Sequence, residues 1–338
     1  MKTVHRNAVK PLVSCGIVHT TDRPHLSIII PAWNEEAALP LTLDSLLTVL
    51  EAENLRDRSE IVVVSDGSTD TTVAAATASL KGRAEYVVVD LARNVGSHAA
   101  IRCGLSHASG DHIVVLSADG QDPPDTIPPM LQKLESGSDI VWGLRAGRDN
   151  DPFSKRASAG AFYRMFRWLT GLEYPPSGLD FVGFTKQVNS AVSQYTERNL
   201  PLFLLIYNLG YSQAVVPYER AERVAGTSGW SFRKRTKLAV DMITAFSAAP
   251  IRLVSLLGVI VAFLGFSFGL LTMIRAIVTD IPVSGWSSMI VLTSVMSGTI
   301  LLGIAAIGEY VWRSLDETRG RPIYLERDVL ASERPKDP

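Results

Sequence analysis

Two long uncharged segments near the C-terminal end of the chain constrain its fold most. Residues 253–274 and 281–308 contain no Asp, Glu, Lys or Arg. Each is longer than the roughly 20 residues with which an α-helix crosses the hydrocarbon core of a membrane. Only residues 275–280 separate them, which leaves room for a tight turn. The segments therefore predict a hairpin of two transmembrane helices, and two buried helices of a soluble domain are the alternative.

Basic residues around the apolar segments predict the orientation of this hairpin. RKRTK at 233–237 and Arg252 precede the first segment, and Arg313, Arg319 and Arg321 follow the second. Because positively charged flanks stay on the cytoplasmic side, both ends of the hairpin should face the cytoplasm. We expect a multi-pass protein of the inner (cytoplasmic) membrane, with its N-terminal domain and both termini in the cytoplasm.

The chain divides into five parts by composition. Its first residues carry charges throughout and lack the unbroken apolar core of a signal peptide, so we expect an extension that stays in the cytoplasm. The predicted boundaries are 1–24 for the extension, 25–228 for a soluble domain, 229–250 for a surface helix, 251–312 for the hairpin, with helices at about 253–275 and 284–310, and 313–338 for a cytoplasmic tail.

The spacing of apolar residues within 229–250 predicts the surface helix. Leu238, Met242 and Phe246 recur every four residues and share one helical face, while Lys and Arg residues lie on the other. Such a basic amphipathic helix suits the headgroup region beside anionic lipids. A helix packed on the soluble domain is the alternative.

The soluble domain alternates β-branched runs with stretches of helical periodicity. The runs predict strands at 26–30, 61–65, 86–91, 112–117 and 139–143. Nearly continuous apolar runs are typical of strands buried on both faces of a parallel sheet. We therefore expect an α/β fold with a doubly wound, mostly parallel sheet, whose ligands bind beyond the carboxyl ends of the strands.

Polar loops follow the first four predicted strands. They read PAWNEE (31–36), SDGSTD (65–70), ARNVGSHAA (92–100) and, within 114–125, LSADGQDPPD. Each alone is a reasonable helix cap, but four at one sheet edge favour a nucleotide-type ligand. No GxGxxG follows the first strand and no GxxxxGK[ST] occurs, which argues against dinucleotide-binding and P-loop proteins. The formal net charge of −1 gives no indication of nucleic-acid binding.

These motifs resemble those of family 2 glycosyltransferases with the GT-A fold. SIIIPAWNEE, VVVSDGSTD, LARNVGSHAAIRCGL and LSADGQDPPDTIPPM match the family's successive motifs. VPYERAERVAGTSGW, the hairpin and GEYVWRSLDETRGRPIY are similar to the polyprenyl-phosphate branch, which includes dolichol-phosphate mannose synthases and bactoprenol glucosyltransferases. The resemblance covers about residues 26–324. It implies an inverting hexosyltransferase that moves a sugar from a UDP- or GDP-sugar to a polyprenyl (undecaprenyl) phosphate on the cytoplasmic leaflet, for cell-envelope glycans.

The resemblance also implies roles for individual residues. Guanidinium groups suit phosphate because they present paired donors and keep their charge. A phosphate monoester is mostly dianionic at neutral pH, so the acceptor needs no general base. The residues so assigned are Pro31, Trp33, Glu35, Asp66 and Arg223 for the nucleotide sugar, Arg145, Lys155 and Arg156 for the acceptor phosphate, with Arg220 a further basic candidate, and Asp119, Asp180, Arg145 and Arg156 for catalysis.

The fourth polar loop corresponds to the family's Asp-X-Asp metal motif. By position, Asp119 and Gln121 would hold Mg²⁺ or Mn²⁺. Ser117 replaces the leading Asp of that motif, and Ser65 replaces the first Asp of the family's Asp-Asp-Gly-Ser. We expect weaker metal binding than in relatives, or a shift in the donor atoms. Asp122 would either substitute as a ligand or cap the following helix, and we favour the cap.

Two alternative functions stay open. The two serines motivate a catalytically impaired protein that binds a nucleotide sugar or a lipid phosphate. A processive polysaccharide synthase is less favoured, because RMFRW at 164–168 lacks the Gln of the Gln-x-x-Arg-Trp motif and two spans are too few for a polymer channel. Gly258, Gly265 and Gly269 would allow close helix packing, which is compatible with a homo-oligomer. His98 is expected to be a plain helix-face histidine.

Overall fold

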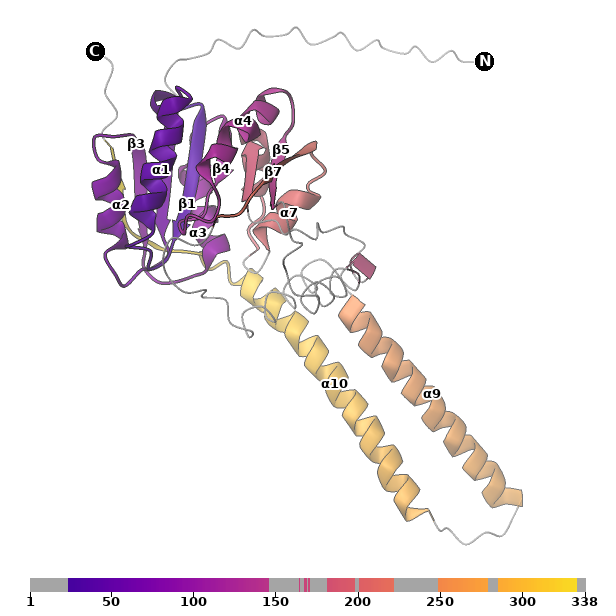
Figure 1. The fold of residues 1–338 in the computed structure, drawn as a ribbon. Coiled ribbons are helices and arrows are strands. Elements are labelled where there is room, and N and C mark those ends of the chain that lie inside the picture. The colour runs from indigo at the N-terminus through magenta and orange to yellow at the C-terminus, as the bar shows by residue number, and fades with distance from the viewer. Residues whose placement is uncertain are drawn as a thin grey trace, which may run out of the picture.

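The computed structural model describes residues 24–145, 164, 167–168, 170, 181–197, 201–221, 249–278 and 285–332. These residues form an α/β domain and two long helices that extend from it (Figure 1). Of the predicted surface helix at 229–250, only residues 249–250 are described, so this prediction lies outside the described residues.

The two apolar segments each form one long helix. α9 spans Ala249–Val278 and α10 spans Trp286–Thr318. Their most apolar stretches, Ile251–Leu271 and Val295–Asp316, have mean hydropathies of 2.4 and 1.5, and neither is buried against other parts of the chain. By length and composition both helices can cross a membrane, which fits the predicted hairpin. α10 continues past the predicted end at residue 310.

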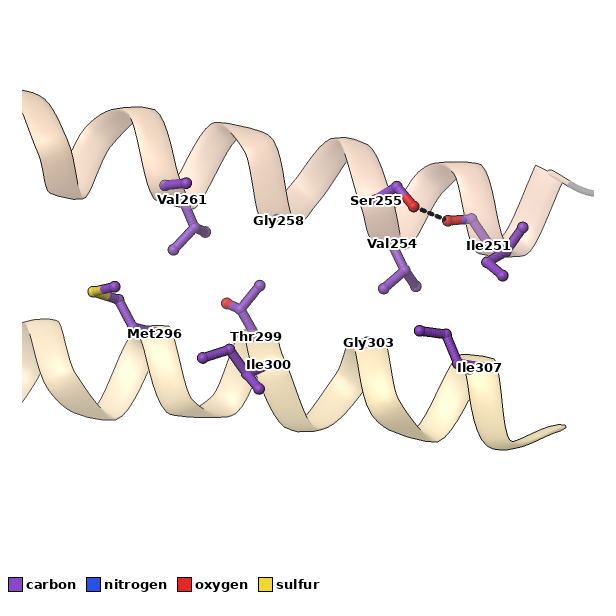
Figure 2. Close-up of a pocket in the computed structure, with 11 residues that line it drawn as sticks. Ile251, Val254, Ser255, Gly258, Val261, Met296, Thr299, Ile300, Gly303 and Ile307 are labelled. Carbon is purple, nitrogen blue, oxygen red and sulfur yellow. Dashed lines mark hydrogen bonds between the residues drawn. The ribbon is translucent and has the colours of Figure 1, made fainter. Parts of the chain in front are cut away.

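The two long helices lie side by side with an apolar groove between them. Figure 2 shows Val254 and Val261 of α9 pointing toward α10, across a space of about 420 Å³. Gly265 faces α10, whereas a side chain at Gly258 or Gly269 would meet no described atom within 4 Å. Gly258 lines the groove between the two helices, so the open space at these glycines does not identify a surface for a further helix, and the homo-oligomer stays a prediction.

An eight-stranded sheet of order β7-β5-β6-β4-β1-β2-β3-β8 forms the centre of the domain. β1 to β4 run parallel, β7 runs parallel to β5, and β6 and β8 are antiparallel to their neighbours. This confirms the predicted mostly parallel α/β sheet. The strands are β1 Leu26–Ala32, β2 Ser59–Ser65, β3 Glu85–Leu91, β4 His112–Val115, β5 Ile140–Arg145, β6 Phe181–Thr185, β7 Gln213–Tyr218 and β8 Glu326–Ala331.

Helices cover both faces of the sheet. On one face lie α1 (Leu39–Ala52), α2 (Thr72–Leu80) and α4 (Ile127–Glu135), and on the other α3 (Ser97–His107), α6 (Lys186–Val192) and α7 (Leu202–Asn208). Short 3₁₀ turns, η1 (Arg56–Arg58) and η2 (Pro124–Thr126), precede β2 and α4.

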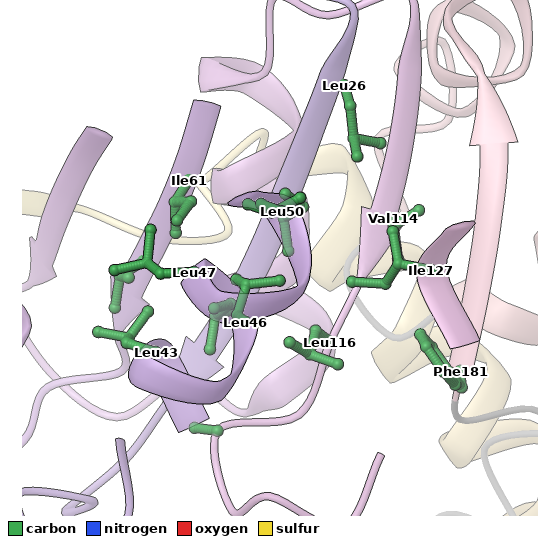
Figure 3. Close-up of a cluster of buried hydrophobic side chains, with 14 of the residues drawn as sticks. Leu26, Leu43, Leu46, Leu47, Leu50, Ile61, Val114, Leu116, Ile127 and Phe181 are labelled. Atoms are coloured by element: carbon green, nitrogen blue, oxygen red, sulfur yellow. The ribbon is translucent and has the colours of Figure 1, made fainter. Parts of the chain in front are cut away.

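This two-sided burial explains why the strand sequences are continuously apolar. Side chains alternate between the faces of a strand, so Ile28 and Ile30 of β1 join the cluster under α1, while Ile29 joins the cluster under α3. Figure 3 shows the first cluster, in which Leu43 and Leu46 of α1 pack over the strands. Each fully buried aliphatic side chain contributes about 1.5–3 kcal/mol. The sheet is therefore rigid enough to position the loops at its edge.

The segment after α10 adds a strand to this sheet. β8 pairs antiparallel with β3, so the domain also contains residues beyond the predicted boundary at 228. Side chains fix the strand to α3: the hydroxyls of Tyr324 and Ser106 lie 3.1 Å apart, and His107 Nε2 lies 2.9 Å from Glu326 Oε1. The predicted tail at 313–338 is thus partly α10 and partly sheet.

Candidate functional site

The loops after β1 and β2 are joined by hydrogen bonds. Asn34, which has a positive φ of 53°, donates its backbone N–H to Ser68 Oγ (3.1 Å) and accepts the Thr69 N–H at Oδ1 (2.8 Å). Glu36 Oε2 accepts from Thr71 Oγ1 at 2.6 Å. Since parallel strands place these loops at one sheet edge, the bonds fuse them into a single wall.

The predicted nucleotide-binding residues of the first loop lie in this wall. Pro31 is half-buried in β1, and Trp33, just beyond the strand, is 45% exposed. Glu35 is held in place because its backbone N–H donates to Thr72 Oγ1 at 2.9 Å. An exposed indole beside a fixed carboxylate can stack on a base and accept hydrogen bonds from ribose hydroxyls. Arg223 lies outside the described residues.

Asp66 ties the second loop to the third. Its carboxylate is buried and accepts the backbone N–H groups of Val95 (2.7 Å, Oδ1) and Gly96 (2.9 Å, Oδ2). Burial raises the pKa of Asp66, and the two hydrogen bonds act in the opposite direction. Gly67 is required beside it, since its φ is +62° and a Cβ would lie 2.3 Å from the Arg93 carbonyl carbon. Asp66 therefore shapes the loops whether or not it also contacts a base.

Ser65 belongs to the same internal network. Its side chain is fully buried at the end of β2 and donates to Ser68 Oγ at 3.0 Å. Ser68 Oγ in turn accepts the Asn34 N–H. Ser65, which stands where the family usually has the first Asp of Asp-Asp-Gly-Ser, therefore uses its hydroxyl to hold Ser68 within this loop.

The fourth loop gathers oxygen donors at the same sheet edge. Asp119 is 8% exposed, and its Oδ1 accepts the Gln121 N–H at 3.2 Å. Ser117 Oγ is buried and has no hydrogen-bond partner among the described residues. A hydroxyl, a carboxylate and an amide oxygen form a donor set for a hard divalent cation, and the unpartnered Oγ gives such an ion a place. The residues fit Mg²⁺ or Mn²⁺.

Arg220 contacts the fourth loop directly. Its guanidinium donates to Gln121 Oε1 at 2.6 Å, and the Ala221 N–H donates to the Gln121 carbonyl at 3.1 Å. The chain after β7 therefore lies against the fourth loop. Arg220, which the sequence placed among candidates for the acceptor phosphate, supplies positive charge beside the proposed cation ligands.

The favoured capping role of Asp122 is wrong. Its buried carboxylate accepts the Tyr218 hydroxyl proton at 2.9 Å, and the side chain makes no cap hydrogen bond to η2. Tyr218 ends β7, so the bond fixes the fourth loop to the neighbouring part of the sheet. Arg145 at the end of β5 is in register with Tyr218 and is half-buried. Of the residues that the resemblance assigns to the acceptor phosphate, Arg145 lies in the described part of the chain, whereas Lys155 and Arg156 lie outside it, as does the predicted catalytic residue Asp180.

His98 has the structural role expected of it. On α3, its Nδ1 accepts the Leu202 backbone N–H at 3.2 Å, and its ring lies 5.2 Å from that of Phe203. Burial, with a further contribution from the nearby Arg102, lowers the pKa of His98 to about 4. The neutral imidazole therefore fixes the start of α7 against α3.

The lowered pKa of His98 predicts that the stability of the folded protein depends on pH. In the unfolded chain His98 is protonated as the pH falls below about 6.5, whereas in the folded protein its pKa is about 4 and it stays neutral down to that pH. The unfolded state binds more protons in this window, so stability is lost as pH falls from 6.5 toward 4. His98→Gln keeps an acceptor for Leu202 and should lose less stability over the same range. Thermal unfolding of both proteins in detergent between pH 7 and 4.5 measures this, and parallel curves would contradict it.

Comparisons with known proteins agree with the motifs. Residues 27–189 match the family model described as Glycosyl transferase family 2. Bactoprenol glucosyl transferase of Shigella phage SfX is 35% identical over 301 residues, which are 89% of this chain and 98% of the relative. Undecaprenyl-phosphate 4-deoxy-4-formamido-L-arabinose transferase of Klebsiella pneumoniae (strain 342) is 31% identical, over 90% of this chain and 93% of that protein. An uncharacterized glycosyltransferase of Bacillus subtilis (strain 168) is 33% identical, over 88% and 92%.

Proposed function

The chain belongs to glycosyl transferase family 2, and from this premise we propose that it transfers a sugar from a nucleotide sugar to a polyprenyl phosphate at a membrane surface. One observation carries the proposal: three hydrogen-bonded polar loops, and a fourth beside them at the carboxyl edge of the sheet, occur on the same chain as two exposed apolar helices. A nucleotide site alone needs no such helices, whereas a lipid acceptor requires a site close to the membrane.

The donor nucleotide is proposed to bind against the wall formed by the first three loops. Trp33 offers its indole to the base, and Glu35 accepts from the ribose hydroxyls. Asp66 holds the third loop in place beneath them. Arg223, assigned to the diphosphate by family resemblance, follows Arg220, which already reaches the fourth loop.

The diphosphate is proposed to meet the fourth loop. Asp119 and Gln121 would hold Mg²⁺ or Mn²⁺ there, with the Ser117 hydroxyl as the neutral third donor. When bound, the cation offsets the negative charge that develops on the departing nucleoside diphosphate. Arg220 holds the amide of Gln121 and adds a fixed positive charge beside the leaving group.

The acceptor phosphate is proposed to enter beside Arg145. A phosphate oxygen forms the new bond to the anomeric carbon as the bond to the nucleoside diphosphate breaks, so one displacement inverts the anomeric configuration. The acceptor is already mostly dianionic, and the protein has to position it rather than remove a proton. Lys155, Arg156 and Asp180 stay predictions for this side of the site.

The lipid tail is proposed to stay in the membrane beside α9 and α10, with the domain on the cytoplasmic side. Arg252 precedes the apolar part of α9, and Arg319 and Arg321 follow that of α10, which is the charge distribution of cytoplasmic flanks. In this arrangement α9 begins, and α10 ends, on the side of the membrane where the acceptor headgroup meets the domain. The product would enter cell-envelope glycan synthesis or modification.

The test is a donor screen with the purified full chain. We expect a lipid-linked sugar when undecaprenyl phosphate and Mn²⁺ or Mg²⁺ are supplied with one member of a panel of UDP- and GDP-sugars. The absence of product from every donor, with folded protein, would refute the transfer. The second candidate, an impaired binding protein, is motivated by Ser117 and Ser65. It predicts nucleotide-sugar binding by calorimetry without turnover.

A further inference from the structure

The C-terminal strand β8 meets β3 through a bulge. Asp90 lies opposite Asp328, but the next residue of β3, Leu91, lies opposite Glu326. Arg327 is therefore the extra residue on β8. A bulge of this kind re-aims a side chain and bends the strand, which makes it a specific feature rather than a pairing defect.

The bulge directs Arg327 to the end of β3. Its Nη1 lies 3.0 Å from Asp90 Oδ2, and its Nη2 donates to the Ala92 carbonyl at 3.0 Å. The Ala92 N–H donates to the Leu325 carbonyl at 2.8 Å. Both backbone polar groups of Ala92, the first residue of the third loop, are thus held by Leu325 and Arg327, at the start of β8.

Arg327 also neutralises a nearly buried acid. The Asp90 side chain is 14% exposed, and its Oδ1 is buried without a hydrogen-bond partner among the described residues. Removing the guanidinium leaves this carboxylate without its cation, which costs more than the loss of an exposed ion pair. The contact therefore matters although the Arg327 side chain is 56% exposed.

The third loop connects Ala92 to the proposed donor site within a few residues. Val95 and Gly96 donate to Asp66, and Arg93 lies against Gly67 with no room for a side chain between them. The path from Arg327 to the second loop thus consists of side-chain hydrogen bonds to the backbone at Ala92 and at Val95 and Gly96, and of a close backbone contact at Gly67. Such a path transmits a displacement because packed elements deform little.

We propose that β8 positions the third loop for donor binding, and that Arg327 is the positioning residue. The inference rests on the proposed function, because it takes that loop as one wall of the nucleotide site. Only residues 319–325 separate β8 from α10, so the strand that shapes the donor site is attached directly to a long apolar helix. Arg327 contacts neither reacting group and acts through Ala92.

Two variants and a matched control test the proposal. Arg327→Met keeps the length of the side chain and removes both contacts, whereas Arg327→Lys keeps a cation for Asp90 without the fork that reaches Ala92 as well. Arg56→Met is the control: Arg56 also donates to a backbone carbonyl, that of Arg83, and pairs with an acid, but before the amino ends of β2 and β3, at the end of these strands opposite to the polar loops.

The first measurement is hydrogen exchange in the full chain in detergent. In Arg327→Met, amides of the segment 92–96 should exchange about tenfold faster, because the loop loses its anchor, while those of β2 stay unchanged. Arg327→Lys should be intermediate and Arg56→Met like the parent protein. Unchanged exchange in the segment 92–96 would overturn the proposal, and Arg327→Lys carries this test should Arg327→Met not fold.

The second measurement is binding of UDP and GDP, each with Mn²⁺, by calorimetry. The Kd of the bound nucleotide should rise about tenfold in Arg327→Met, with kcat at saturating donor changed less than KM. An unchanged Kd together with faster loop exchange would overturn the link to donor binding. If the parent protein binds neither nucleotide although the variant loop exchanges faster, the proposed donor site fails and the positioning of the loop stands.

Discussion

Substitution of Asp119 by Asn is expected to reduce sugar transfer roughly 10²- to 10³-fold, the range seen when one electrostatic contribution to leaving-group stabilisation is removed. Asn keeps the shape of the side chain and can still accept the Gln121 N–H, so the fourth loop should stay folded. What it removes is the one charge among the three proposed ligands. The loss should therefore fall on turnover and on metal affinity, and the unfolding temperature should change little.

Initial rates across a Mn²⁺ titration, after treatment with EDTA, separate these effects. Asp125→Asn is the matched control, because Asp125 lies in the same loop region, is exposed, and loses the same charge. It should keep the rate and the Mn²⁺ dependence of the parent protein. An Asp119→Asn protein with the parent's rate and metal requirement would show that the cation, if one is used, binds elsewhere.

The sequence predicts β1 to β5 well because each is a run of β-branched residues buried on both faces. β7 and β8 lack that signal. β7 lies at the sheet edge and contains Pro217, a residue that argues against a central strand. All residues of β8 are exposed, and its partner β3 lies more than two hundred positions away along the chain. Pairing of this kind depends on tertiary contacts, which no local pattern encodes.

In the candidate site, too, the sequence predicts the local features and misses those that depend on tertiary contacts. The motifs located the polar loops and the oxygen donors of the fourth loop, and the structure brings them to one sheet edge. They did not reveal that Asp66 holds the third loop or that Asp122 binds Tyr218, since these partners lie 29 to 30 and 96 residues away. From sequence, an Asp that precedes two prolines is expected to cap the following helix. Asp122 binds Tyr218 instead because the fold places the end of β7 beside the fourth loop.

The hydroxyl of Ser117 leads to the second large effect. Ser117→Asp would restore the carboxylate that the family motif carries, at a buried position where the present Oγ has no hydrogen-bond partner among the described residues. With a divalent cation bound, the added charge should lower the Mn²⁺ concentration for half-maximal activity by roughly 30- to 100-fold, since affinity follows the number of charged ligands. Without the cation, the new carboxylate adds repulsion near Asp119 and is poorly solvated, so the metal-free protein should be less stable than the parent.

The variant should thus unfold at a lower temperature than the parent in EDTA and gain more stability when Mn²⁺ is added, because only the folded state offers the complete site. Ser65→Asp is the matched control: it restores the other family carboxylate, but at a hydroxyl already bonded to Ser68, and should leave the Mn²⁺ requirement unchanged. Equal Mn²⁺ requirements for Ser117→Asp and the parent, in protein that still binds nucleotide, would remove Ser117 from the cation site. If the parent binds donor without turnover and Ser117→Asp transfers sugar, the chain is the impaired binding protein, and this one hydroxyl accounts for the impairment.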